Sequence, residues 1–316
     1  MNLFLATFES VAVLLGIGII GFWIIGKKVV PVTVLQSLSP LALEIALPSL
    51  IFVNIIQDFS PESNPFWWQL PLWWLFFTGI SALCTAAFMF VAETSKRKEF
   101  ALSLFYQNGI FFPLAVLTGM FQDAEPYVIS LFLFTLFYPG FFFSTYHLFF
   151  PDGKKKPVSL PLKKIFHPAF LATIIAVALI MLGIGSYVPH LFVSILSILG
   201  AMTVPLLMLI LGGNVYVDYK NQGPLNLLEI IKFIMVKNVL FPLIMIGILL
   251  IIRPYISYTI ALILLLQSAV PPLTAVPIVT ERLNGDRSYV SQLLVGSFLA
   301  SIVSLPLMIF VFSSIF

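Results

Sequence analysis

The sequence predicts an all-α integral membrane protein with ten transmembrane helices, built as two inverted five-helix repeats in which the fourth and ninth helices are broken. Three observations support this fold class. Of the 316 residues, 60% are hydrophobic and 9% are charged, whereas soluble domains have roughly a quarter of their residues charged. Apolar runs close to the ~20 residues that cross a bilayer follow one another along the chain. Two of these runs, placed alike in the two halves, contain amides and prolines.

The expected membrane spans follow in order along the chain. They are residues 4–26, 33–56, 69–92, 99–121, 126–149, 166–186, 191–214, 228–252, 256–280 and 289–315. The first span contains Glu9 and lacks the basic start and cleavage site of a signal peptide, so we expect it to be retained. Residues 1–150 then form the first repeat, residues 151–165 a basic cytoplasmic loop, and residues 166–316 the second repeat.

Charged residues in the connections orient the spans, because Lys and Arg in short loops stay cytoplasmic. Basic residues follow the first, third and fifth spans: Lys27, Lys28, Lys96, Arg97, Lys98, Lys154, Lys155, Lys156, Lys163 and Lys164. Acidic residues occupy the alternate loops: Asp58, Glu62, Asp123 and Glu125. In the second half, Lys220 and Arg282 fit this orientation and Arg253 does not. We therefore expect both termini outside, and the short loops suggest a bacterial cytoplasmic membrane.

The fourth span carries a polar interruption. In FYQNGIFFPL, residues 105–114, the triplet Gln107, Asn108 and Gly109 precedes Pro113 within an apolar run. Proline lacks an N–H and breaks or kinks a helix. Irregular backbone at membrane depth is tolerated only where it is buried in protein or lines a cavity. The span is therefore predicted to be broken, with its polar triplet satisfying freed backbone groups or contacting a substrate.

The ninth span repeats this pattern about 160 residues later. YQNGIFFPLAV aligns without gaps with LQSAVPPLTAV, which matches Gln267 and Ser268 to Gln107 and Asn108 and places Pro271 and Pro272 near Pro113. LPSLIF in the second span lies over VPLLML in the seventh at a similar spacing. Five spans per half make the second half enter the membrane inverted, and such repeats build secondary transporters whose broken helices meet near the midplane. The alternative is two proline-kinked helices with amides facing a neighbour, but the match of both spans favours a crossing.

Other polar residues inside spans are candidates for function, since ionisable groups are costly there. Glu44, near the middle of the second span, is a candidate coupling-ion site, or else a buried carboxyl that is hydrogen-bonded to a neighbouring helix. Lys237 in the eighth span is a candidate countercharge to a carried anion, or it reaches the membrane interface. Asn54 and Asn214 are expected to cap the ends of corresponding spans.

No metal site or cofactor is expected. Cys84 is the single cysteine, so neither a disulfide within the chain nor a cysteine-built metal site can form. The three histidines, His147, His167 and His190, lie near span ends without the spacing of metal ligands.

Three motifs make the sequence resemble the auxin efflux carrier family. They are YQNGIFFPLAVLTGMF in the fourth span, ILGAMTVPLLMLILGGNV in the seventh and LLQSAVPPLTAVPIVTERL in the ninth. By this match, Asn108 takes the place of the family's fourth-span asparagine, and Pro113, Pro271 and Pro272 take the places of its prolines. Ser268 departs from the more amide-rich pattern of the plant members.

The resemblance implies a ten-span fold similar to that of bile acid–sodium symporters, with substrate bound beside the crossing of the fourth and ninth helices. It also implies an elevator-like motion. Spans 3–5 and 8–10 would form a transport part that moves against a scaffold of spans 1, 2, 6 and 7. Plant members of the family work as dimers, so a homodimer is expected.

We therefore expect a secondary carrier of small organic anions, auxin-like or dicarboxylate, with proton or sodium as possible coupling ions, and not an enzyme. Its partners would be the substrate and membrane lipids, without nucleic acid. There is no Walker motif for primary pumping by this chain. One alternative, a sodium-coupled bile-acid-type symporter, needs a cluster of oxygen ligands. Another, a membrane enzyme acting on lipids, needs paired carboxylates or a histidine constellation.

Overall fold

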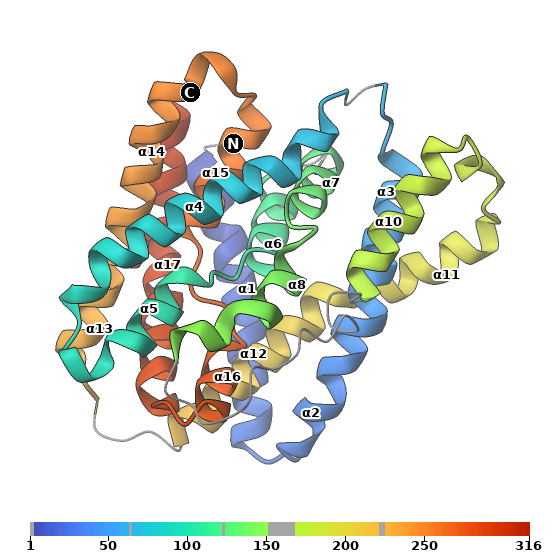
Figure 1. Ribbon diagram of the computed structural model, residues 1–316. Coiled ribbons are helices and arrows are strands. Elements are labelled where there is room, and N and C mark those ends of the chain that lie inside the picture. The colour runs from blue at the N-terminus through green and yellow to red at the C-terminus, as the bar shows by residue number, and fades with distance from the viewer. Residues whose placement is uncertain (1–2, 63–64, 122–123, 151–167, 221–224) are drawn as a thin grey trace.

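The computed structural model describes residues 3–62, 65–121, 124–150, 168–220 and 225–316, and these residues form an all-helical protein (Figure 1). Seven helices are long and apolar enough to cross a membrane: Thr7–Gly26, Thr33–Asp58, Trp67–Val91, Glu125–Phe149, His190–Lys220, Leu227–Tyr255 and Arg287–Ile315. Three shorter apolar helices, Phe111–Met120, Pro168–Met181 and Tyr258–Ala269, fall within the predicted fourth, sixth and ninth spans. The predicted basic loop at residues 151–165 lies outside the described residues.

In the first half the helices are α1 Leu3–Gly26, α2 Thr33–Pro40, α3 Leu47–Asp58, α4 Leu70–Phe88, α5 Arg97–Phe105, α6 Phe111–Met120, α7 Glu125–Phe134 and α8 Tyr138–Thr145. A π-helical turn, η1 Leu41–Ala46, joins α2 to α3. Prolines open several of these helices, because the first helical turn leaves its N–H groups without intrahelical partners. Pro71 in α4 and Pro126 in α7 are examples.

In the second half the helices are α10 Pro168–Met181, α11 His190–Ala201, α12 Thr203–Lys220, α13 Leu227–Ile234, α14 Phe241–Ile252, α15 Tyr258–Ala269, α16 Val276–Arg282 and α17 Arg287–Ile315. The π-helical turn η7 Met235–Leu240 joins α13 to α14. The predicted seventh span is too short, because α12 continues to Lys220. Asn214 therefore lies inside a helix, as does Asn54 in α3, and the expectation that they cap helix ends is wrong.

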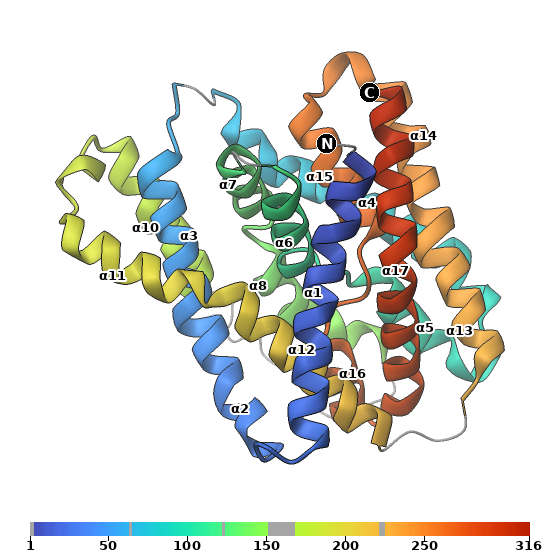
Figure 2. The same ribbon diagram turned by 180° about the vertical axis from the view of Figure 1, so that it is seen from behind.

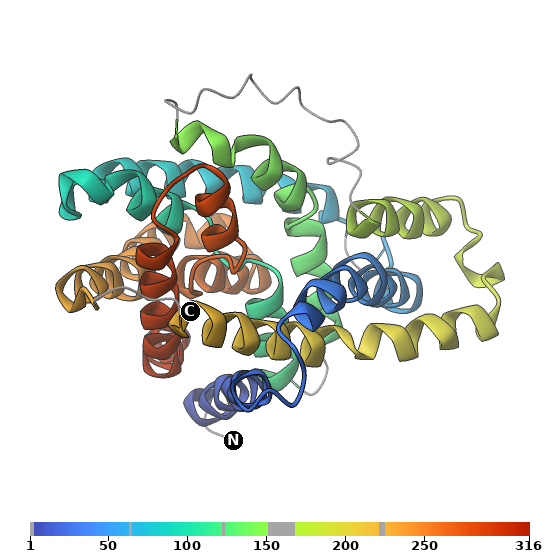
Figure 3. The same ribbon diagram turned by 90° about the horizontal axis from the view of Figure 1, so that it is seen from below.

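The helices form two groups joined by α1 and α12. Figures 1 and 2 show α2, α3, α10 and α11 on one side, and α4, α5 and α13–α17 on the other. Seen from below, α11 and α12 run one after the other across the molecule (Figure 3). α1 begins and α17 ends at the same end of the molecule (Figure 1).

The tightest helix contact lies between α1 and α12 and depends on glycine. A Cβ added to Gly212 would lie 1.7 Å from the carbonyl oxygen of Gly18, and one added to Gly21 would lie 2.3 Å from that of Leu209. Small residues let transmembrane helices approach backbone to backbone. In lipid the hydrophobic effect does not drive helices together, so van der Waals packing stabilises such a contact instead. This contact holds α12 in place, and α12 lines the site described below.

Candidate functional site

The fourth and ninth spans are broken and cross each other, as the sequence predicts. The chain between α5 and α6 pairs with the chain between α15 and α16 through an antiparallel bridge of Gln107 with Pro272. The N–H of Asn108 donates to the carbonyl of Pro271 at 2.8 Å, and the N–H of Leu273 donates to that of Tyr106 at 2.9 Å. This pairing satisfies backbone groups that neither water nor a helix can satisfy at this depth.

Side chains reinforce the crossing at its centre. Gln267 donates from Nε2 to the carbonyl of Gly109 at 2.6 Å, and Gln107 donates to Oε1 of Gln267 at 3.4 Å across a separation of 160 residues. A Cβ at Gly109 would lie 2.4 Å from Oε1 of Gln267, so this close approach requires glycine. The two predicted glutamines and Gly109 therefore join the two halves.

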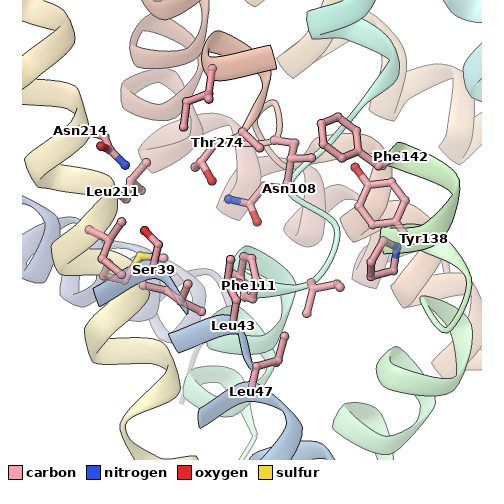
Figure 4. A pocket seen from close by; sticks show the side chains of 18 of the residues that line it. Ser39, Leu43, Leu47, Asn108, Phe111, Tyr138, Phe142, Leu211, Asn214 and Thr274 are labelled. Atoms are coloured by element: carbon pink, nitrogen blue, oxygen red, sulfur yellow. The ribbon is translucent and has the colours of Figure 1, made fainter. Parts of the chain in front are cut away.

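A cavity of about 230 Å³ lies against this crossing (Figure 4). Its lining comes from α2, η1, α3 and α12 on one side and from the crossing, α8 and α16 on the other: Ser39, Leu43, Leu47, Leu207, Met208, Ile210, Leu211 and Asn214, against Asn108, Ile110, Phe111, Tyr138, Pro139, Phe142, Phe143, Leu273, Thr274, Ala275 and Ile278. None of these described residues is charged. The cavity is a mostly apolar chamber with a few amides and hydroxyls.

Asn108 is the unusual member of this lining. Its side chain is 1% exposed, yet neither its amide nitrogen nor its amide oxygen has a hydrogen-bond partner among the described residues. Figure 4 shows the amide directed into the space that Ser39, Asn214 and Thr274 also face. A buried amide without partners costs about 1–3 kcal/mol. Such a group is expected where a ligand supplies the missing hydrogen bonds.

The comparison with known families decides what kind of protein carries this crossing. The family model described as membrane transport protein matches residues 6–160 and 157–309, which together cover nearly the whole chain. The chain belongs to the membrane transport protein family. This is the family of auxin efflux carrier-type transporters, which confirms the resemblance of the three motifs. No curated protein matches the sequence.

The other predicted substrate residues of this transporter lie behind the cavity rather than in its lining. Ser268 donates its hydroxyl to the carbonyl of Leu265 at 2.6 Å, within its own helix. Lys237 is fully buried and donates from Nζ to the carbonyl of Ser268 at 3.2 Å. Gln107 and Gln267 face each other, so Asn108 is the predicted residue that meets the cavity.

The predicted coupling-ion candidate, Glu44, is exposed on the surface of η1 and lines none of the described cavities. The expectation that this carboxyl is buried is wrong, because the π-helical turn directs it outward while Ala42 and Ala46 face the core. Among the described residues, no group of three or more His, Cys, Asp and Glu side chains lies close enough to hold a metal ion.

Sequence analysis missed four polar residues of the cavity: Ser39, Tyr138, Asn214 and Thr274. Tyr138 donates its hydroxyl to the carbonyl of Gln107 and so fixes the segment that presents Asn108. The signal for Asn214 was present in the sequence, since it matches Asn54 in the repeat. The Asn214 side chain faces the cavity because α12 continues past this residue, and the apolar pattern did not predict that continuation.

A second cavity, of about 200 Å³, lies between α3, α6, α7 and the junction of α11 with α12. The linings of the two cavities are related by the 160 residues that separate Gln107 from Gln267. This cavity is lined by Leu50, Asn54, Leu114 and Thr118. The residues 160 positions later, Ile210, Asn214, Thr274 and Ile278, line the first cavity. The two cavities are thus counterparts under the sequence repeat.

Pro113 explains why the carbonyl of Gly109 is free for Gln267. Proline is the third residue of α6 and has no N–H to donate to the carbonyl four residues earlier, which belongs to Gly109. We expect Pro113→Ala to supply a competing donor and to loosen the crossing. Transport should fall at equal membrane abundance, measured as solute uptake per amount of reconstituted protein. Uptake equal to that of the unaltered protein would contradict this role for Pro113.

Proposed function

We propose that this transporter is a secondary carrier of organic carboxylates, bound in the cavity beside Asn108. The unpartnered Asn108 amide carries the proposal, because its N–H groups are suited to a carboxylate oxygen. Asn108 also lies just before α6, whose ten residues direct the positive end of the helix dipole toward it. Apolar side chains surround these donors and would enclose a hydrophobic substrate body.

The lining favours one carboxylate on an apolar body over a dicarboxylate. A second carboxylate would be placed against leucines and phenylalanines, and an ionised group without partners is strongly disfavoured in such surroundings. A sodium-coupled bile-acid-type symporter is the second candidate. Its ion site requires several oxygen ligands, and the described cavity offers Asn108, Asn214, Ser39, Thr274 and Tyr138 without a carboxylate.

For the mechanism we propose elevator-like alternating access between two inverted five-span repeats. Spans 1, 2, 6 and 7 would be the scaffold, and spans 3–5 and 8–10 the moving transport part. The Asn108 cavity lies between these two parts, and its repeat counterpart supports an equivalent opening on the other side. The Asn108 cavity is lined by Asn214, and Tyr216 in the same helix lies against Gly26, which precedes Lys27 and Lys28. The positive-inside rule assigns these two lysines to the cytoplasm.

An ion pair joins the two parts beside this cavity, one turn beyond Asn214. Arg287 at the start of α17 donates to Oδ1 of Asp218 in α12 at 2.6 Å from Nη2 and at 3.0 Å from Nε. Asp218 is 7% exposed, so the pair is partly desolvated. Arg287 also pairs with Glu281. In the proposed motion, these bonds stabilise the conformation described above, in which the Asn108 cavity lies between the two parts.

We expect Arg287→Gln to shift the carrier away from this state, since the variant leaves the buried Asp218 carboxylate without a hydrogen bond to a charged group, worth about 1.5–3 kcal/mol. The measurement is the distance between spin labels on α2 and α16, which frame the cavity. The variant should gain a second distance population. Lys96→Gln is the matched control, because its ion pair with Asp286 lies within the transport part. Identical distributions in both variants would contradict the motion.

The function itself is tested by thermal stabilisation of the purified protein. Indole-3-acetate, malate, malonate and a bile acid are compared with neutral analogues, with and without sodium and at two pH values. A ligand that binds only the folded state stabilises it by about 2.7 kcal/mol at a hundredfold excess over Kd. We expect a shift with monocarboxylates alone. A shift that requires sodium and a bile acid would favour the second candidate instead.

A further inference from the structure

The second cavity differs from the first in carrying a charge. Its lining includes Glu125 at the start of α7, whereas no described residue of the first cavity is charged. Glu125 is exposed and forms no ion pair with another described residue. Its counterpart 160 residues later is Gly285, which lines neither cavity. The negative charge is therefore particular to the second cavity and does not follow from the repeat.

Two other groups in this lining can accept hydrogen bonds. Thr118 in α6 donates its hydroxyl to the carbonyl of Ala115 at 3.1 Å, and a hydroxyl that donates can still accept through its oxygen. Asn54 in α3 contributes an amide oxygen. An ammonium group has three N–H donors and a positive charge. It therefore matches the carboxylate, amide oxygen and hydroxyl oxygen of this cavity.

Electrostatics favour a cation over an anion in the second cavity. The carboxylates of Glu125 and of Asp58, which ends α3, lie close enough for their charges to repel each other. A bound carboxylate would add to this repulsion, whereas a bound ammonium group would relieve it. The two cavities are thus counterparts in position but opposite in the charge that they favour.

The rest of the lining sets the size and polarity of the ligand. Apolar walls come from Leu50, Leu114, Val128 and Val204. The volume of about 200 Å³ is below the roughly 300 Å³ at which pockets for drug-sized ligands begin. The cavity therefore fits a small amine with one apolar ring system, such as an indole, and an ammonium group at one end.

The second cavity also lies between the parts that move in the proposed mechanism. α3 and the junction of α11 with α12 belong to the scaffold, and α6 and α7 belong to the transport part. A ligand that contacts Asn54 on one side and Glu125 on the other joins the two parts. Such a ligand binds one arrangement of the parts better than another, so it stabilises the arrangement described here.

We propose that the second cavity is a binding site for small amphiphilic amines, and that an amine bound there inhibits the carrier. Glu125, Asn54 and Thr118 bind the ammonium group. The inhibition rests on the proposed function, since it requires a transport cycle to arrest, whereas amine binding does not. The first cavity is present in the same conformation, so the amine slows transport without displacing the carboxylate.

The probe is tryptamine, and 3-ethylindole, which has the same ring system and no charge, is its neutral comparison. Binding of both to the purified protein is measured by calorimetric titration and by the shift in melting temperature. Glu125→Gln removes the charge, and Glu125→Asp keeps it. The matched control is Glu62→Gln, because Glu62 is exposed, lines none of the described cavities and is predicted on the same side of the membrane. Uptake of indole-3-acetate into liposomes and its binding are measured with and without tryptamine.

We expect tryptamine to bind more tightly than 3-ethylindole. Glu125→Gln should bind tryptamine roughly tenfold or more weakly, as follows from losing a hydrogen bond between charged groups. Glu125→Asp and Glu62→Gln should retain tryptamine binding. Tryptamine should lower the uptake of indole-3-acetate and leave the binding of indole-3-acetate intact.

Equal binding of tryptamine and 3-ethylindole, or unchanged tryptamine binding by Glu125→Gln, would overturn the amine site. Tryptamine that displaces indole-3-acetate would overturn it as well, because the amine would then occupy the first cavity. Full uptake with tryptamine bound would overturn the inhibition. If tryptamine binds through Glu125 and no carboxylate binds to the protein, the proposed function fails and the amine site stands.

Discussion

Replacing Asn108 by alanine should weaken carboxylate binding and at the same time leave the ligand-free protein as stable as before, or more stable. The backbone N–H that donates to Pro271 remains in the variant. The side chain that is lost makes no hydrogen bond among the described residues, so its removal relieves a penalty of about 1–3 kcal/mol. Binding loses a hydrogen bond to a charged group, worth about 1.5–3 kcal/mol, or roughly tenfold to a hundredfold in Kd.

The matched control is Asn238→Ala, because Asn238 is equally buried but its side chain has hydrogen-bond partners. Asn238 donates to the carbonyl of Ser297 at 3.1 Å and accepts from the hydroxyl of Ser297 at 2.7 Å. Its loss should lower the melting temperature because these groups are left without partners. Melting curves with and without indole-3-acetate separate the two effects. The proposed site is wrong if Asn108→Ala is destabilised as much as Asn238→Ala and still shows the full ligand shift.

Gly212→Ala should be the most destabilising small change in the scaffold. The added methyl would lie 1.7 Å from the carbonyl oxygen and 2.6 Å from the carbonyl carbon of Gly18, and backbone atoms cannot rotate away. α1 and α12 must therefore separate. Inserting a methyl group into a well-packed interior costs typically 1–3 kcal/mol, and we expect the upper end of this range. The same displacement moves Ile210 and Leu211, so carboxylate binding should weaken as well.

The control for this prediction is Gly247→Ala in α14, where an added Cβ would meet no atom within 4 Å. Alanine is the better helix former by about 1 kcal/mol, so this variant should melt at the same or a higher temperature. The two variants are compared by melting in detergent and by their elution as a single species. Equal melting temperatures would show that α1 and α12 are not in the contact described.

Much of the fold was predictable because membrane spans depend on local composition. A run of apolar residues must form a helix in lipid, since every backbone group needs a partner within its own segment. The breaks in the fourth and ninth spans were predictable for the same reason, because amides and prolines interrupt two runs at matching positions. The π-helical turns η1 and η7 were not predicted. Such a turn adds one residue to the helical turn and leaves the run of apolar residues uninterrupted.

By itself the sequence determined the helical membrane class, the repeat spacing and the polar crossing, all of which depend on residue type and order along the chain. Which polar side chain meets the cavity was decided only by the tertiary structure. Gln107, Asn108 and Gln267 are equally plausible in sequence, yet the pairing of the two halves turns the glutamines toward each other and leaves the Asn108 amide facing the cavity. The physical reason is that hydrogen-bond partners from the opposite half, 160 residues away, decide which groups are satisfied and which remain available for a ligand.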